Sequence, residues 1–210
     1  MKDGKTYQFK PLKTLAGWAR GLMVAFLIVL TLFTALLAFG LFTGTPVDFN
    51  AEDLDGIGLL TSLSALLSLT VQVVSGIVSL LWIYGAARNT RAVRPQLDLK
   101  PIWAVAWFFV PIAFWFKPYQ YMCQIWSTAK GPQDGRYLKE ARPVVMWWTF
   151  WVIAMISGNI AWRIDDPGAY SIAQLINSLF VFLATIQFMG LVGSITRMQA
   201  DTDIRIVEQF

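Results

Sequence analysis

The residues of this chain that could carry chemistry are single polar side chains placed inside long apolar stretches. Lys117 is the only charged residue between positions 101 and 129, and Gln72 is the bulkiest polar group near the middle of the apolar stretch 56–87. Charged and strongly polar groups at membrane depth are costly to bury, which makes them candidates for functional contacts. The residues predicted to contact a ligand, a lipid or a partner are Lys117, Tyr119, Gln120, Gln72, Asn177 and Gln187.

Each of these candidates also has a purely structural interpretation. Lys117 lies near a predicted membrane interface, where a lysine can extend its ammonium group into the headgroups. Asn177 and Gln187 lie on two different polar faces of the stretch 170–196, which packing against two neighbouring helices would explain. Gln72 belongs to a polar stripe that could be a close packing seam between helices or the wall of a polar pocket. This stripe consists of Thr61, Ser64, Ser68, Gln72, Ser75 and Ser79.

Recognised catalytic patterns are absent from the sequence, which predicts that the protein is not an enzyme. It contains no phosphate-binding glycine loop, no nucleophile elbow and no zinc signature. It contains no histidine, so the commonest metal ligand and the usual activator of a cysteine nucleophile are missing. The single cysteine, Cys123, is therefore predicted to be a packing residue. We expect no catalytic residue, no cofactor and no metal site.

The elements that must position the candidate residues are indicated by composition and charge placement. Apolar residues make up 56% of the 210-residue chain and charged residues 14%, against about 45–50% and about 25% in soluble domains. Five stretches contain no charged residue: 21–47, 56–87, 101–116, 143–162 and 167–196. A membrane-spanning helix needs about 20 mostly apolar residues. Four of the stretches are long enough, and the stretch 101–116 is too short.

The basic residues then predict the topology. Apart from Lys117 and Arg163, they lie in the N-terminal tail, in the loops 88–100 and 130–142, and in the C-terminal tail. Lysine and arginine in short loops stay on the cytoplasmic side. If residues 101–129 return to the side they started from, all these groups are cytoplasmic and the two opposite loops carry none. If the segment crosses, both sides carry several, so the returning arrangement is favoured and both termini are predicted to be cytoplasmic.

The segment 101–129 is accordingly predicted to be a re-entrant or interfacial hairpin that packs against the body of four helices. Pro111 interrupts its apolar run, and Lys117-Pro118 is a second break. Residues 118–129 are predicted to form a short amphipathic helix, about 18 Å long at 1.5 Å per residue, which is too short to cross a bilayer. The predicted spans are about 18–42, 57–87, 143–163 and 170–196. The fold class is an all-α polytopic membrane helix bundle, four transmembrane helices plus this hairpin, in a single domain over 1–210.

The hairpin segment also resembles the core motif of a bacterial membrane-protein family called "domain of unknown function 4328". The motif consists of Trp103-Ala104-Val105, Trp107-Phe108, Pro111, Lys117-Pro118-Tyr119-Gln120 and Ile125-Trp126. The family pattern often has an asparagine three residues before the Lys-Pro pair, where this chain has Phe114. The resemblance implies a bacterial inner-membrane location and the same helical layout, and it implies no reaction.

These observations favour a structural or accessory subunit of a membrane assembly, or a homo-oligomer. The alternative is a small-molecule or lipid transporter or channel that uses the broken segment around Lys117. The expected partners are the lipid bilayer and either other membrane subunits or further copies of the chain. The pI near 9.3 does not indicate nucleic acid binding, because the basic residues lie in short loops where membrane topology explains them.

Overall fold

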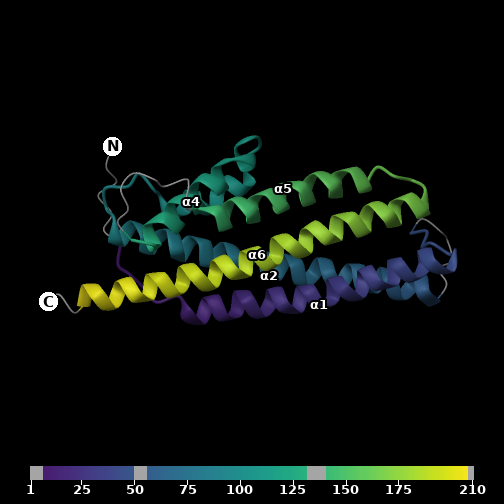
Figure 1. Ribbon diagram of the computed structural model, residues 1–210, viewed down its shortest axis with the longest axis horizontal. Helices are drawn as coiled ribbons and strands as arrows, with labels where there is room; N and C mark the ends of the chain where they lie inside the picture. Colours follow the sequence, from purple (N-terminus) through teal and green to yellow (C-terminus); the bar gives the residue numbers. More distant parts are fainter. Residues whose placement is uncertain (1–6, 50–55, 132–140, 208–210) are drawn as a thin grey trace. The chain divides into compact units, whose positions relative to one another are not determined.

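The structure is a computed structural model that describes residues 7–49, 56–131 and 141–207. These residues form helices and connecting turns, and no β-strand occurs among them (Figure 1). Two one-turn 3₁₀ helices, η1 (Trp107–Phe109) and η2 (Ala113–Trp115), separate the short helices α3 and α4. The α-helices are α1 (Lys13–Thr43), α2 (Gly56–Val93), α3 (Pro101–Ala106), α4 (Lys117–Ala129), α5 (Arg142–Ala161) and α6 (Pro167–Val207). The predicted all-helical class is confirmed.

Four helices, α1, α2, α5 and α6, are long and apolar enough to cross a membrane. They correspond to the four predicted spans. The helices are longer than the predictions at several ends: α1 begins at Lys13, α2 continues to Val93, and α6 begins at Pro167 and continues beyond 196. Apolar runs mark the length of helix that lies in hydrocarbon. Helical hydrogen bonds are internal to the segment, so a helix can continue into the polar region where the apolar run ends.

Local sequence determines where two of these helices begin and end. At the start of α6, the Asp166 carboxylate accepts a hydrogen bond from the Ala169 N–H at 2.7 Å, and Pro167 occupies the first turn. At the end of α1, Gly44 adopts a positive φ of 74°, a conformation that glycine reaches without strain. The Gly44 N–H donates to Leu41 O at 3.3 Å and the Thr45 N–H to Gly40 O at 2.9 Å. This is a Schellman motif.

Gly40 allows α1 to end in this Schellman motif. A Cβ atom at position 40 would lie 2.9 Å from the Thr45 carbonyl oxygen, which is backbone and has little freedom to move. The glycine thus lets the chain fold back tightly and sets the direction of residues 46–49.

The chain divides into two compact units, which are described separately. The first unit contains residues 1–20, 77–146 and 187–210, and the second contains 21–76 and 147–186. Each of the four long helices contributes residues to both units. The prediction of a single domain stays a prediction.

The second unit is built on an apolar stripe of α1. Phe26, Leu30, Phe33 and Leu37 are buried, with the spacing of three and four residues that places side chains on one helix face. Ala65 and Val71 of α2 pack against the stripe, as do three α6 residues, Leu175, Val181 and Phe182.

The first unit is joined by polar contacts that involve α2, α6 and the segment before α1. Asn89 of α2 donates from its amide to Lys10 O at 2.8 Å and accepts from the Lys10 N–H at 3.0 Å. The same amide donates to Gln199 Oε1 at 3.3 Å, and Gln199 donates in turn to Ala86 O at 3.1 Å. Trp82 donates to Thr196 at 3.0 Å.

The segment 101–129 lies entirely within the first unit and bends sharply. Its halves, 101–109 and 113–129, meet at an angle of 112°. The bend occurs at Pro111 and Ile112, and Ile112 has a φ of 67°, which is rare for a β-branched residue. The predicted breaks at Pro111 and at Lys117-Pro118 are confirmed as the positions where helix stops and resumes.

The predicted amphipathic character of α4 is also confirmed. One side of this helix is buried and the other is polar and exposed, with Gln120 and Gln124 on the exposed side. The buried residues are Pro118, Met122, Cys123, Ile125, Thr128 and Ala129.

Candidate functional site

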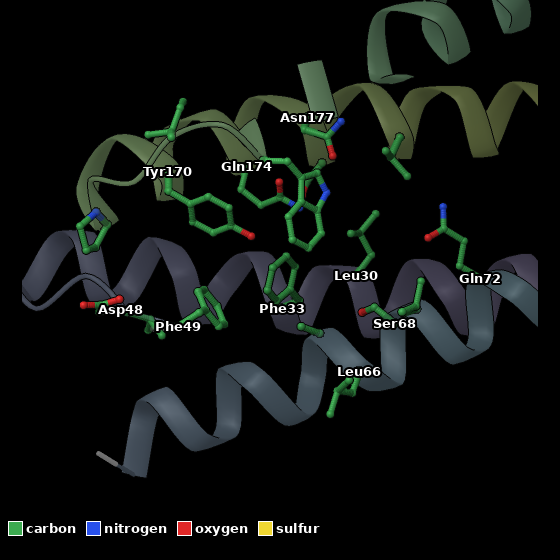
Figure 2. Close-up of a pocket in the computed structure, with 18 of the residues that line it drawn as sticks. Leu30, Phe33, Asp48, Phe49, Leu66, Ser68, Gln72, Tyr170, Gln174 and Asn177 are labelled. Carbon is green, nitrogen blue, oxygen red and sulfur yellow. The ribbon is translucent and has the colours of Figure 1, made fainter. Parts of the chain in front are cut away.

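The second unit contains a cavity of about 580 Å³ (Figure 2). This volume lies in the range of about 300–1,000 Å³ typical of small-molecule sites. All of its lining residues belong to the second unit. They come from α1, from residues 47–49, from α2, from the connection between α5 and α6, and from α6. The cavity therefore brings together three separate regions of the chain, 26–49, 65–72 and 162–181.

One wall of the cavity is apolar. It is formed by Phe26, Leu30 and Phe33 of α1, with Leu66 and Leu69 of α2. The three α1 residues belong to the buried stripe that forms the core of the unit. The wall of the cavity and the core of the unit are thus the same helix face, so the cavity has a well-packed side.

Polar side chains line the cavity from two helices. Ser68 and Gln72 extend from α2, and Gln174 and Asn177 extend from α6 (Figure 2). Residues four apart on α2 and three apart on α6 share a helix face. Each helix therefore presents its pair to the same space.

Two lining hydroxyl groups have no hydrogen-bond partner among the described residues. They belong to Ser68, which is 7% exposed, and to Ser178, which is 4% exposed. In helices, serine and threonine hydroxyls commonly bond back to a carbonyl of the preceding turn, as Ser64 does to Thr61 O at 2.8 Å. Ser68 and Ser178 do not, so each buried hydroxyl leaves hydrogen-bonding capacity unused among the described residues.

Asn177 is held in place by α5. Its amide nitrogen donates to Ala154 O at 2.7 Å and to Ser157 Oγ at 3.1 Å. Gly158 makes room for it, because a Cβ at that position would lie 3.2 Å from the Asn177 nitrogen. Both of the amide hydrogens are thus used in fixing the side chain, and the carbonyl oxygen is the group left for the cavity.

One end of the cavity combines carboxylates with aromatic rings. Asp48 and Asp165 are its charged lining residues, from the two connections 44–49 and 162–166. The rings of Phe49 and Tyr170 meet edge to face with centroids 5.6 Å apart, which joins the connection 44–49 to the first turn of α6. Trp162 also lines the cavity. Carboxylates beside aromatic faces favour positively charged groups.

The hairpin positions a second set of predicted residues in the first unit. The Lys117 ammonium lies 5.8 Å from the Trp107 ring centroid and 5.7 Å from that of Phe116. Tyr119 is half-buried and hydrogen-bonds Cys123. Burial raises the pKa of the Cys123 thiol, and the Tyr119 hydrogen bond partly offsets the rise. Gln120 is exposed.

The six predicted contact residues therefore do not form one site. Gln72 and Asn177 line the cavity of the second unit, whereas Lys117, Tyr119 and Gln120 share the hairpin of the first. Gln187 is half-buried on α6 in the first unit. The polar stripe of α2 is mostly buried, and Gln72 is its exposed member.

Some contributors to the cavity were missed by sequence reasoning. Gln174 and Ser178 of α6 line the cavity beside Asn177, and neither was among the six predicted contact residues. Asp48 and Tyr170 were not predicted to contribute, because only the fold brings the connection after α1 close to the start of α6. Asp166, at the same end of the unit, caps α6 and is not a lining residue of the cavity.

Comparisons with known proteins give one match. The model of a family described as domain of unknown function (DUF4328) matches residues 46–197, which is most of the chain. The match begins near the start of the α1–α2 connection and extends to the end of the apolar part of α6, so it includes the hairpin and most of the cavity. No curated protein and no solved structure matches the chain.

Proposed function

Because this chain belongs to the family described as domain of unknown function (DUF4328), whose description assigns no activity, we propose its function from its own geometry. The protein is a non-catalytic component of the bacterial cytoplasmic membrane. It acts as a structural or accessory subunit that packs against other membrane subunits or against copies of itself.

The observation that carries this proposal is the exposed Gln72 on α2. The most apolar window of α2 is only 22% buried, the lowest value among the four spanning helices. Leu69, one turn before Gln72, is also exposed. Where the Gln72 amide faces hydrocarbon, it lacks hydrogen-bonding solvent. Amide side chains in this situation hydrogen-bond across helices, which supports a contact between α2 and another chain.

The proposal includes both termini on the cytoplasmic side and the segment 101–129 as a re-entrant or interfacial hairpin. Residues 1–20 and 187–210 belong to the same compact unit, and so do both ends of this segment. The basic loops 88–100 and 130–142 flank the segment within that unit. Both chain ends, both ends of this segment and the basic loops are expected to lie in one unit if the four long helices cross the bilayer and the segment returns to its starting side.

Exposed apolar groups at the bend of the hairpin give this arrangement further support. Phe109 is 72% exposed and Ile112 is 78% exposed, and Trp115 is also exposed. These side chains would be unfavourable in water. Aromatic residues are enriched among lipid headgroups, where one side of the ring is apolar and the other wet.

A second candidate function is a small-molecule or lipid transporter or channel. The cavity favours it, because Gln72 and Asn177 line a space large enough for a ligand, and two further lining residues have buried hydroxyls without a partner among the described residues. The broken segment around Lys117 is the other feature that such a protein would use. Discontinuous helices within membranes often accompany ligand or ion sites.

The subunit proposal is tested by measuring self-association of the full chain in lipid nanodiscs, together with the membrane proteins that co-purify after gentle extraction. We expect a stable complex that Gln72→Leu weakens about threefold, the average effect of one interhelical hydrogen bond in a membrane. The matched control is Asn159→Leu, since Asn159 is also exposed but bonds Met155 O on its own helix at 2.8 Å. A monomer without co-purifying protein would contradict the proposal.

The transport alternative is tested in proteoliposomes by following movement of a fluorescent phospholipid between leaflets. If the cavity and the broken segment form the route, Gln72→Leu and Lys117→Ala both slow this movement. Unchanged movement in both variants would argue against transport.

A further inference from the structure

Three features of the cavity in the second unit together specify a ligand. The first is the pair of buried hydroxyls of Ser68 and Ser178, two lining residues whose hydroxyls have no partner in the described part of the chain. Most buried polar side chains in proteins are hydrogen-bonded, so such exceptions require an explanation. A ligand with a hydroxyl or carbonyl group at this depth would supply the missing partner.

The second feature is the charge at one end of the cavity. Asp48 and Asp165 line that end, and the described residues that line the cavity include neither lysine nor arginine. Trp162 and Tyr170 lie among the same lining residues. Two carboxylates beside aromatic rings attract a protonated amine and disfavour an anionic headgroup.

The third feature is the apolar wall of Phe26, Leu30 and Phe33 on α1, which Leu66 and Leu69 extend on α2. A hydrocarbon chain or ring on this wall would be removed from polar surroundings. Sites that hold amphiphiles combine such a wall with a small number of placed polar groups.

We propose that this cavity binds a lipophilic amine. Its ammonium group lies at the end with Asp48 and Asp165, a hydroxyl or carbonyl group bonds Ser68 and Ser178, and its apolar body lies along the α1 wall. This inference shares the cavity with the second candidate function. It does not depend on transport, because an amine can bind without being moved across the membrane. The amine is either a free amphiphile or the headgroup of a bilayer lipid such as phosphatidylethanolamine.

The test measures binding of N-dodecylethanolamine to the full chain in phosphatidylglycerol nanodiscs. N-dodecanoylethanolamine is the matched control ligand, since it keeps the chain and the hydroxyl but replaces the ammonium with a neutral amide. We expect the amine to bind at least about tenfold more tightly, as a charge-assisted hydrogen bond provides. Equal binding of the two ligands, or no binding of either, would overturn the proposal.

Variants then locate the site. The double substitution Asp48→Asn with Asp165→Asn should weaken amine binding about tenfold and leave amide binding unchanged. The control Asp201→Asn alters an exposed carboxylate of the first unit and should change neither. The ligand would lie elsewhere if the double variant still bound the amine more tightly than the amide. The same would follow if only Asp201→Asn lost this preference for the amine.

The serine contacts are tested separately. Ser68→Ala and Ser178→Ala should each weaken both ligands about fivefold, the effect of one neutral hydrogen bond. Ser64→Ala is the control, because this hydroxyl lies on the same stripe but bonds Thr61 O. Unchanged binding in both test variants would remove the serines from the site.

Nanodiscs of phosphatidylethanolamine distinguish the two sources of amine. If the bilayer lipid is the occupant, these discs weaken the apparent binding of added N-dodecylethanolamine to the wild type but not to the double aspartate variant. If a free amphiphile is the occupant, binding is the same in both lipids. Assembly of the protein is measured on the same samples, so failure of the subunit proposal is seen independently of failure to bind amine.

Discussion

At the scale of single residues, Asn89 fixes the segment before α1 by pairing its side-chain amide with both backbone polar groups of Lys10. Its amide oxygen accepts from the Lys10 N–H and its amide nitrogen donates to the Lys10 carbonyl. Asn89 is 1% exposed, and Gln199 completes its hydrogen bonding. Leu12, two residues after Lys10, packs where Gly85 lacks a side chain. One asparagine thus positions the approach of the chain to its first spanning helix.

We expect Asn89→Ala to destabilise the protein by about 2–3 kcal/mol, since it removes three hydrogen bonds and leaves buried groups unpaired. The Lys10 amide should lose its protection as well. Hydrogen–deuterium exchange of a peptide covering residues 7–12, with thermal unfolding in detergent, measures both effects.

Asn159→Ala is the control, because this exposed asparagine bonds only within α5. If residues 7–12 exchange equally slowly in wild type and Asn89→Ala, Asn89 does not anchor the segment.

At the scale of elements, the hairpin depends on an unusual residue at its bend. Ile112 has a positive φ, for which a β-branched residue is poorly suited, and its side chain is exposed. Strained conformations persist where the surroundings require them. An exposed isoleucine at the bend gives an apolar tip, which a less strained glycine would not provide.

The hairpin proposal predicts the side from which α4 can be labelled. Cys123 is 4% exposed and its raised pKa lowers the thiolate fraction, so it should react slowly. In a Cys123→Ser background, Gln124→Cys should react with a membrane-impermeant maleimide only from the cytoplasmic side. Arg163→Cys, in the connection between α5 and α6, should react only from the opposite side.

Labelling of both positions from the same side would contradict the arrangement of spans, and labelling of position 124 from outside would show that the segment crosses. A denatured sample, in which both cysteines react, controls for the presence of each thiol.

At the scale of the whole molecule, the helical class and the four spans were predictable from the sequence. Long uncharged runs are required by the thickness of the bilayer, so they carry the signal directly. The helix ends were predicted less accurately, because α2 and α6 continue with polar residues after the apolar run ends. The breaks in the segment 101–129 were predictable from Pro111 and Pro118.

The cavity was only partly predictable. Helical spacing placed Gln174, Asn177 and Ser178 on one face of α6, and Ser68 with Gln72 on one face of α2. The sequence does not reveal that these two faces share a space, nor that Ser68 lacks the backbone bond that Ser64 makes. Those properties depend on packing between segments distant in sequence.

The topology as a whole predicts equal behaviour of the two chain ends. Reporter enzymes that fold only in the cytoplasm should be active when fused before Met1 or after Phe210 and inactive when inserted after Ile164. Activity at one terminus only would require an odd number of crossings and would contradict the proposed orientation.

The close approach of the Thr45 carbonyl oxygen to Gly40 has a consequence for attempts to stabilise the protein by sequence design. Alanine is preferred over glycine inside helices by about 1 kcal/mol, so a propensity-guided redesign would choose it at position 40. The methyl group would meet the Thr45 carbonyl oxygen at 2.9 Å and force the chain out of its reversal. Residues 47–49, which line the ligand space, would shift with it. At this one position, the residue with the higher helix propensity would distort the binding pocket.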